Sequence, residues 1–221
     1  MSCLDAKHKA FLTLHERPGA FVMPNPWDAG STRIPQALGY EAPATTSAGF
    51  AFSIGRRDST AALSRDAILE NARAIVEATH LPVSADPEDG FCEASEECAP
   101  RTTCGASPTS TARFAVCRPS SRRAHVLNAP NLPDPDAVRT VCAAVSRPVN
   151  VVAGLSGQQH TVAELQDAGV KRISVGGSFA QAALGGPARA AQEVLERGTF
   201  TYVSEAMSAR EAKSPTADAA R

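Results

Sequence analysis

The sequence predicts an α/β fold in which short buried strands alternate with helices and form a parallel sheet. The strands read as nearly continuous apolar runs, which is typical of strands that helices cover. Helix-like segments close on a glycine and the next strand follows at once, as at Gly39-Tyr40 and Gly169-Val170. Polar and small residues gather after each strand, where loops line the ligand site of parallel α/β folds. About six such βα units can be recognised.

The first half of the chain holds three of these units. Their predicted strands lie in AFVMPNPWDAG (20–30), YEAPATTSAGF (40–50) and LPVSAD (81–86). A helix-like stretch covers 31–39, and the clearest helix covers 64–80. Ser64 suits the N-cap of that second helix. Its apolar face, read at helical spacing, comprises Ile68, Ala72, Ile75 and Val76.

The second half repeats the pattern. Strands are predicted in HVLNAP (125–130), RPVNVVAGLSG (147–157) and VKRISVGGS (170–178). Helices are predicted at 134–146, 161–169 and 179–198. We expect Gly185, Gly186 and Pro187 to break or bend the last helix. Lys171 and Arg172 begin a strand at the end opposite the ligand site, so we expect them to serve stability and solubility.

The segment 92–124 does not fit the pattern. A closed (β/α)8 barrel of the TIM type needs eight units and typically about 250 residues, so 221 residues with about six units predict an incomplete barrel. The stretch 99–123 carries five arginines and no acid, without helical or strand periodicity. It could be a basic loop that grips an anionic substrate. We favour a disordered insert or a shift of reading frame, since a structureless loop of this length is unusual.

We expect one domain over residues 1–221, with an irregular segment at 92–124 and a frayed tail at 204–221. The net charge of −1 argues against nucleic acid or a membrane surface as a partner. No apolar run reaches the roughly 20 residues that span a bilayer. Charges interrupt the first 21 residues, which argues against a signal peptide. We therefore expect a cytoplasmic protein.

The stretch PVSADPEDGF (82–91) starts as a buried strand and ends in acids. Val83 suits a core, whereas Asp86 and Glu88 do not. A carboxylate directly after a buried strand is unfavourable unless it is paired, solvated or bound to a cation. Because loops after parallel strands share one mouth, these acids are predicted to point into the ligand site.

The run from Pro24 to Asp58, PNPWDAGSTRIPQALGYEAPATTSAGFAFSIGRRD, followed by LPVSADPEDGF (81–91), resembles the isocitrate lyase / phosphoenolpyruvate mutase superfamily. The resemblance is closest to short bacterial members and covers about 10–91 and 125–203. It implies a (β/α)8 barrel that is often tetrameric, with the last helix exchanged between subunits. Members bind Mg²⁺ and a small oxo or hydroxy carboxylic acid. They make or break a C–C or P–C bond through an enolate-like pyruvate intermediate.

The resemblance also implies substrate-binding residues. They are Ser47, Ala48, Gly49, Trp27, Asp28 and Asn150. The first three match a loop that holds the substrate carboxylate through backbone N–H groups. Trp27 and Asp28 would line the mouth in the first unit, although Asp28 and Ser31 could instead cap the first helix. Asn150 lies on a strand where the family often has an Asn that contacts substrate.

The implied metal site consists of acids. Asp58 matches a catalytic acid near the metal, although beside Arg56 it could instead be a surface ion pair. Asp86 matches the second acid of an Asp-Ala-Asp metal motif whose first acid is replaced by Ser84, and Glu88 would compensate as a ligand. Mg²⁺ is a hard cation that prefers such carboxylates and water. It would stabilise a developing enolate oxygen.

Two elements of the family pattern are missing between residues 91 and 125: a strand ending in Glu-Asp and one carrying Ala-Arg-Thr/Ala-Glu. Two readings stay open. The chain is a Mg²⁺-dependent lyase or phosphonomutase-type enzyme, or it is a catalytically impaired or inactive relic. A doubly wound phosphate binder is disfavoured, because no Gly-rich phosphate loop occurs. The Ala-rich last helix predicts a homo-oligomer, a dimer or tetramer.

Overall fold

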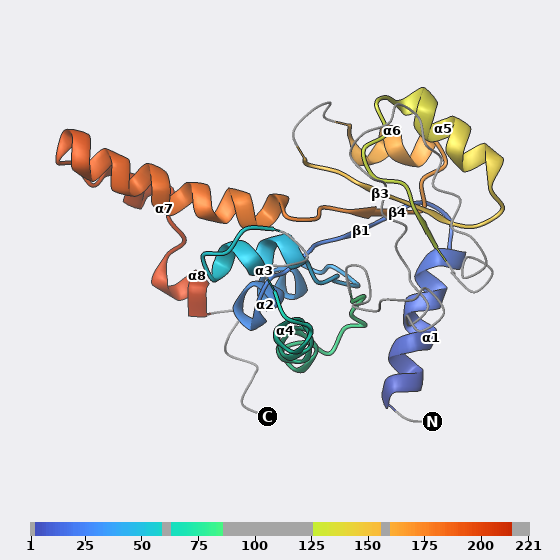
Figure 1. Cartoon of the computed structure of the whole chain (residues 1–221), viewed down its shortest axis with the longest axis horizontal. Helices are drawn as coiled ribbons and strands as arrows, with labels where there is room; N and C mark the ends of the chain where they lie inside the picture. Colours follow the sequence, from blue (N-terminus) through green and yellow to red (C-terminus); the bar gives the residue numbers. More distant parts are fainter. Residues whose placement is uncertain (1–2, 59–62, 86–125, 156–159, 214–221) are drawn as a thin grey trace.

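The computed structural model describes residues 3–58, 63–85, 126–155 and 160–213. Four parallel strands form one sheet in the order β1-β4-β3-β2 (Figure 1). Their bounds are β1 Phe21–Met23, β2 Leu127–Asn128, β3 Val149–Val152 and β4 Arg172–Ser174. The predicted parallel α/β fold is thereby confirmed.

Two further segments extend this sheet beyond β1. Ala44 forms a parallel bridge with Ser84, and its N–H donates to the carbonyl of Pro24, 2.9 Å away. The first strand of the chain, β1, thus lies between the Ala44 segment and the last strand, β4. Pairing of the first and last strands is what closes a barrel. The six strand segments therefore occupy neighbouring positions of the predicted barrel, and the remaining stretch, 86–125, lies outside the described residues.

Helices follow the strands, as the βα pattern predicts. Their bounds are α1 Cys3–Glu16, α2 Ala29–Ala37, α3 Ser47–Ser53, α4 Arg65–Glu77, α5 Pro135–Ala144, α6 Val162–Asp167, α7 Ser178–Arg197 and α8 Ala209–Lys213, with a 3-10 turn η2 at Thr201–Ser204. Side-chain caps start four of the predicted helices, at Asp28, Ser64, Asp134 and Thr161. The helices α1, α3 and α8 were not predicted.

The outer face of the sheet carries the apolar core, which α5 and α6 cover (Figure 1). The buried strand residues on this face are Val149, Val151 and Ile173. Successive strand side chains point to opposite faces. The residues between them, Asn150, Arg172 and Ser174, therefore lie on the inner face, and all three are buried. The inner face of β3 and β4 is polar.

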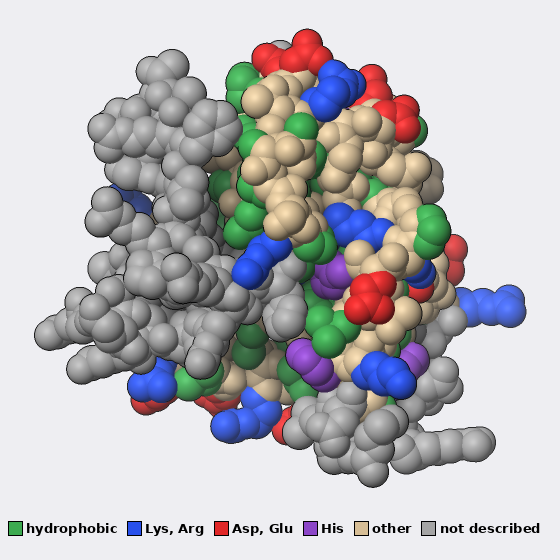
Figure 2. Space-filling model, turned by 90° about the vertical axis from the view of Figure 1, so that its right-hand side faces the viewer, with side chains coloured by type: hydrophobic (Ala, Val, Ile, Leu, Met, Phe, Trp, Pro, Cys, Tyr) green, Lys and Arg blue, Asp and Glu red, His purple; other side chains and the backbone are tan. Residues whose placement is uncertain are grey.

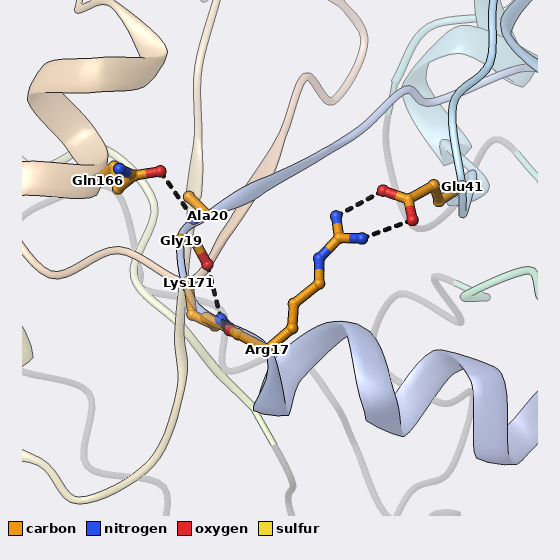
Figure 3. Close-up of polar contacts among 6 residues, drawn as sticks. All are labelled: Arg17, Gly19, Ala20, Glu41, Gln166 and Lys171. Atoms are coloured by element: carbon orange, nitrogen blue, oxygen red, sulfur yellow. Dashed lines mark hydrogen bonds and ion pairs between the residues drawn. The ribbon is translucent and has the colours of Figure 1, made fainter.

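Polar contacts join the strand starts at the end opposite the predicted ligand site (Figure 3). Arg17 makes two hydrogen bonds to the carboxylate of Glu41, at 2.6 and 2.5 Å. The ammonium of Lys171 donates to the carbonyls of Arg17 and Gly19. Gln166 accepts a backbone N–H of the same segment. Lys171 thus serves stability, as the sequence predicted.

The last long helix, α7, is continuous from Ser178 to Arg197. Of the two expected outcomes at Gly185, Gly186 and Pro187, the break does not occur, and a bend stays a prediction. A proline inside a helix lacks the N–H for one i→i−4 hydrogen bond and crowds the carbonyl of residue i−4. It also restricts the residue before it, and Gly186 has no Cβ to add to that clash. Figure 1 shows α7 extending away from the sheet. Part of the predicted frayed tail, Ala209–Lys213, is helical.

None of the helices in the described residues combines the length and apolar character needed to cross a bilayer. Figure 2 shows the face that carries α1, α5 and α6, on which basic and acidic side chains are interspersed. This mixture fits the small net charge of the chain.

Candidate functional site

A buried amide fixes the carboxyl ends of three strand segments. Asn25 follows β1 and is 5% exposed. Its Nδ2 donates to the carbonyl of Thr45 at 2.9 Å, and its Oδ1 accepts the N–H groups of Val175 and Gly176 at 2.9 and 3.0 Å. One side chain thus satisfies three backbone groups, in two loops, that would otherwise be buried and unpaired. Hydrogen bonds within the protein therefore hold this part of the mouth in place.

Asp28 is the N-cap of α2. Its Oδ1 accepts the N–H of Ser31 at 2.6 Å, and the Ser31 hydroxyl accepts the N–H groups of Trp27 and Asp28 at 3.0 Å. The capping alternative is therefore confirmed. Asn71 also holds this turn, because its Nδ2 donates to the Trp27 carbonyl at 2.8 Å. A direct contact of Trp27 or Asp28 with substrate stays a prediction.

The predicted carboxylate loop is the first turn of α3. Thr46 caps this helix, and its hydroxyl accepts the N–H of Gly49 at 3.2 Å. The N–H groups of Ser47 and Ala48 donate to no side chain or carbonyl of the described residues. Unpaired N–H groups at a helix start attract anions. Ser47 and Ala48 are therefore available for a carboxylate, whereas the Gly49 N–H is used within the turn.

Close packing brings several predicted site residues together. A Cβ on Gly49 would lie 2.6 Å from the Thr46 methyl and 3.1 Å from the Cβ of Trp27. A Cβ on Gly177, in the turn between β4 and α7, would lie 3.2 Å from the Cβ of Ala48. Trp27, Ala48 and Gly49 are thus neighbours at the mouth, which the sequence could not show.

Asn150 lies at the centre of a polar network on the inner face. Its Nδ2 donates to the carbonyl oxygen of the Asn128 side chain at 2.6 Å and to the Ser174 hydroxyl at 3.0 Å. Its Oδ1 accepts the Nε–H of Arg172 at 2.9 Å. The network joins β2, β3 and β4. The predicted contact of Asn150 with substrate stays a prediction, since both its N–H groups serve the network.

Arg172 is the site residue that sequence reasoning missed. It is 4% exposed, so its expected role in solubility is wrong. Burial lowers its pKa to about 10, which leaves the guanidinium charged at neutral pH. The signal was present in the strand: Arg172 and Ser174 alternate with the apolar Ile173, so they share the face opposite the apolar core.

The two predicted metal ligands, Asp86 and Glu88, fall outside the described residues, and the predicted catalytic acid, Asp58, does not. Asp58 is exposed. The Thr45 N–H donates to the carbonyl of Ser84 at 2.9 Å, so the strand that leads to Asp86 leaves the sheet beside the start of α3. The described part of the chain holds no cluster of three side chains that could bind a metal. The three acidic roles stay predictions.

A family model matches most of the chain. The model described as phosphoenolpyruvate phosphomutase matches residues 11–103 and 124–195. The chain belongs to this family. The superfamily predicted from the motif run is thereby confirmed. The unmatched internal stretch, 104–123, lies within the segment predicted to be irregular.

Solved structures of phosphomutase-family relatives share this fold. A candidate lyase/mutase from Burkholderia cenocepacia J2315 is 37% identical, with a TM-score of 0.84 and 98% coverage of both chains. A 2,3-dimethylmalate lyase of the PEP mutase/isocitrate lyase superfamily is 16% identical, with a TM-score of 0.75, over 97% of this chain and 95% of that chain. A phosphonopyruvate hydrolase in complex with oxalate and Mg²⁺ is 15% identical, with a TM-score of 0.75, over 96% and 95%. No curated protein sequence matches the chain.

Proposed function

We propose that the chain is a Mg²⁺-dependent lyase or phosphonomutase-type enzyme. It would make or break a C–C or P–C bond of a small oxo or hydroxy acid through an enolate-like pyruvate intermediate. Membership of the phosphomutase family supports this class of reaction. The observation that carries the proposal is the hydrogen bond from Thr45 to Ser84, which sets the start of α3 beside the strand that leads to Asp86.

In this proposal the substrate carboxylate binds to the N–H groups of Ser47 and Ala48. Packing of the α3 turn against Trp27 keeps these donors in place. Asp86 and Glu88 would hold Mg²⁺, with Asp58 as the nearby catalytic acid. Their carboxylates are the hard oxygen ligands that Mg²⁺ prefers. When bound, Mg²⁺ polarises a carbonyl group and stabilises negative charge on its oxygen.

The alternative is a catalytically impaired or inactive family member. Ser84 favours this reading, because a hydroxyl stands where the resemblance implies the direct carboxylate ligand. Its backbone N–H and carbonyl are both bonded to the neighbouring segment, so its position in the sheet is fixed. The loss of one carboxylate would weaken Mg²⁺ binding without disturbing the fold.

Deuterium exchange into pyruvate separates these readings, whatever bond the natural substrate contains. An enzyme that forms the pyruvate enolate replaces the methyl protons by deuterium in D₂O, which proton NMR follows. We expect Mg²⁺-dependent exchange above the protein-free rate. Asp86→Asn should abolish it, whereas Asp66→Asn, an exposed acid in the first turn of α4, should not. Exchange at the protein-free rate would favour the impaired member.

We further propose a single cytoplasmic domain that forms a homo-oligomer, a dimer or tetramer. Support for the oligomer comes from α7, whose side chains Leu184 and Leu195 are 48% and 88% exposed. Figure 1 shows this helix projecting from the rest of the described chain. Large exposed apolar side chains on a projecting helix are typical of surfaces that a partner covers.

A further inference from the structure

One side chain of α4 ties down the turn 27–31, which begins α2. Asn71 lies near the middle of α4, and its Nδ2 donates to the Trp27 carbonyl at 2.8 Å. The other hydrogen bonds of the turn run within it or to α2, through Asp28, Ser31 and Thr32. In the part of the chain that the structure describes, Asn71 thus makes the one hydrogen bond from another element to this turn. Internal bonds fix the shape of the turn, and Asn71 fixes its position.

The presence of an asparagine inside α4 has a physical reason. Asn is a weak helix former, because its side chain competes for backbone hydrogen bonds. The Trp27 carbonyl precedes the N-cap of α2, and no backbone N–H of the described residues donates to it. A carbonyl that is partly withdrawn from water needs a donor. Asn71 supplies that donor from a helix that packs against α2 (Figure 1).

Trp27 connects this turn to the first turn of α3. A Cβ on Gly49 would lie 3.1 Å from the Cβ of Trp27, so the two residues are in van der Waals contact. The two residues before Gly49, Ser47 and Ala48, carry the N–H groups that are proposed to bind the substrate carboxylate. A shift of the turn 27–31 would therefore move the side chain against which these donors are packed.

The chain after α4 holds the same segment by a second contact. The strand segment that follows α4 includes Ser84, whose carbonyl accepts the Thr45 N–H at 2.9 Å. Thr45 directly precedes Thr46, the N-cap of α3. Residues 65–84 thus contact the start of α3 twice, directly through Ser84 and indirectly through Asn71 and Trp27. The two attachments together fix the direction of this short helix.

We propose that Asn71 is a positioning residue for the proposed reaction, because its hydrogen bond to the Trp27 carbonyl holds the carboxylate-binding turn of α3 in place. This inference rests on the proposed function, in which the N–H groups of Ser47 and Ala48 bind the substrate carboxylate. Asn71 acts through Trp27 and makes no contact with the substrate. Displacement of a binding group by about 1 Å can cost about a hundredfold in rate, so a distant support of this kind matters.

Tryptophan fluorescence tests the first step, in which Asn71 holds the turn. Trp27 is the single tryptophan of the chain, so its emission reports on this turn directly. Asn71→Leu keeps a side chain of similar volume and removes the donor. We expect acrylamide to quench the unliganded variant more strongly than the wild type, because the untied turn opens more often to solvent. Equal quenching in a folded Asn71→Leu protein would overturn the proposal.

Calorimetry of oxalate binding with Mg²⁺ tests the second step. We expect the affinity of Asn71→Leu to fall by about three- to tenfold, as the loss of one supporting hydrogen bond predicts. Thr79→Val is the matched control. Thr79 is buried just beyond the end of α4 and donates to Gln36 of α2, at the end opposite the mouth. Both variants should melt at a lower temperature than the wild type, but Thr79→Val should bind oxalate like the wild type.

The two measurements separate failure of this inference from failure of the proposed function. If the wild-type protein binds no oxalate with Mg²⁺, the proposed function is wrong, and this inference falls with it. If the wild type binds oxalate and Asn71→Leu binds it equally well, only the role of Asn71 is wrong. The same conclusion follows if Thr79→Val loses as much affinity as Asn71→Leu, because the loss then reflects stability alone.

A second variant covers the case in which Asn71→Leu does not fold. Asn71→Asp keeps the shape of the side chain, but an ionised carboxylate has no N–H to donate. Acrylamide should again quench Trp27 more strongly than in the wild type, in a measurement without ligand or metal. Wild-type quenching in a folded Asn71→Asp protein would show that the hydrogen bond does not hold the turn.

Discussion

At the scale of single residues, Gly49 shows how tightly the predicted carboxylate loop is built. Gly49→Ala would place a Cβ 2.6 Å from the Thr46 methyl, so the capped turn must shift. We expect a loss of about 1–3 kcal/mol in the free energy of unfolding, as is typical of overpacking, and weaker binding of oxalate. Urea denaturation and calorimetry measure the two effects.

Gly30→Ala is the matched control for this prediction. Its Cβ would meet only an oxygen of Asp28 at the ordinary distance of 3.5 Å, and alanine is the better helix former by about 1 kcal/mol. This variant should be as stable as the wild type or more stable. Equal effects of the two substitutions would contradict the close packing of the α3 turn.

Single residues also mark the limit of sequence reasoning. The capping role of Asp28 could be predicted, because Asp and Ser at this spacing are a local signal. The roles of Asn25 and Arg172 could not, because each depends on strands that are distant in the sequence. Alternation along a strand shows which residues share one face of the sheet. It does not show whether that face lies inside the barrel, because this depends on where the helices pack.

At the scale of elements, Asp28 can be tested as a cap and as a site residue with one pair of variants. Asp28→Ala removes the acceptor for the Ser31 N–H and should lower the free energy of unfolding by about 1 kcal/mol. Asp28→Ser keeps a good cap and removes the carboxylate. If Asp28 only caps α2, the serine variant retains both stability and ligand binding. Weak ligand binding by a stable Asp28→Ser protein would instead place the carboxylate in the site.

The ion pair between Arg17, which follows α1, and Glu41, which precedes the Ala44 strand segment, predicts a dependence of stability on pH. The hydrogen bonds from Arg17 hold the pKa of Glu41 below its ordinary value of 4.5 (Figure 3). A carboxyl group with a lowered pKa stabilises the fold above pH 4.5 and loses this effect as the pH falls through the lowered pKa. The Glu41 side chain is 49% exposed, so its contribution stays below about 1 kcal/mol.

Glu41→Gln measures this contribution. The variant should melt at a lower temperature than the wild type at pH 7, and the two melting temperatures should converge as the pH falls well below 4.5. A difference that persists unchanged into acid would show that the loss has another cause than the charge of Glu41.

Elements with a clear apolar period could be predicted, and the others could not. The helix α4 carries buried Ile68 and Ile75 at helical spacing after a Ser64 cap, so its presence and its start followed from the sequence, although it ends at Glu77 and not at residue 80. The helix α3 has only seven residues, which is too short for a period to emerge. In α7 the Gly-Gly-Pro run suggested a break, yet packing of its start against α3 and the missing Cβ of Gly186 allow one helix.

At the scale of the whole molecule, the sheet order explains why the fold class could be predicted. Each βα unit carries its own local signal, and six units suffice to indicate a barrel. The pairing of β1 with β4 joins the first and the last strand of the chain. No local sequence pattern predicts this pairing. The family match then confirmed the superfamily that the Pro24–Asp58 run had indicated.

The exposed apolar side chains of α7 predict assembly. Light scattering should give a dimer or a tetramer. Leu195→Glu, at a side chain that is 88% exposed, should shift the protein toward monomer, because a charge disfavours burial in an interface. Arg189→Glu, at an exposed position of the same helix, is the control for charge alone. A wild-type monomer would contradict the proposed homo-oligomer.

Calorimetric titration of oxalate into the wild-type chain tests the central claim most directly. The account predicts one oxalate per chain in the presence of Mg²⁺, with an affinity at least about tenfold higher than without the metal. Asp86→Asn should bind no better with Mg²⁺ than without it. Equal binding with and without Mg²⁺, or no heat up to about 1 mM oxalate, would contradict a metal-assisted site at the mouth of this barrel.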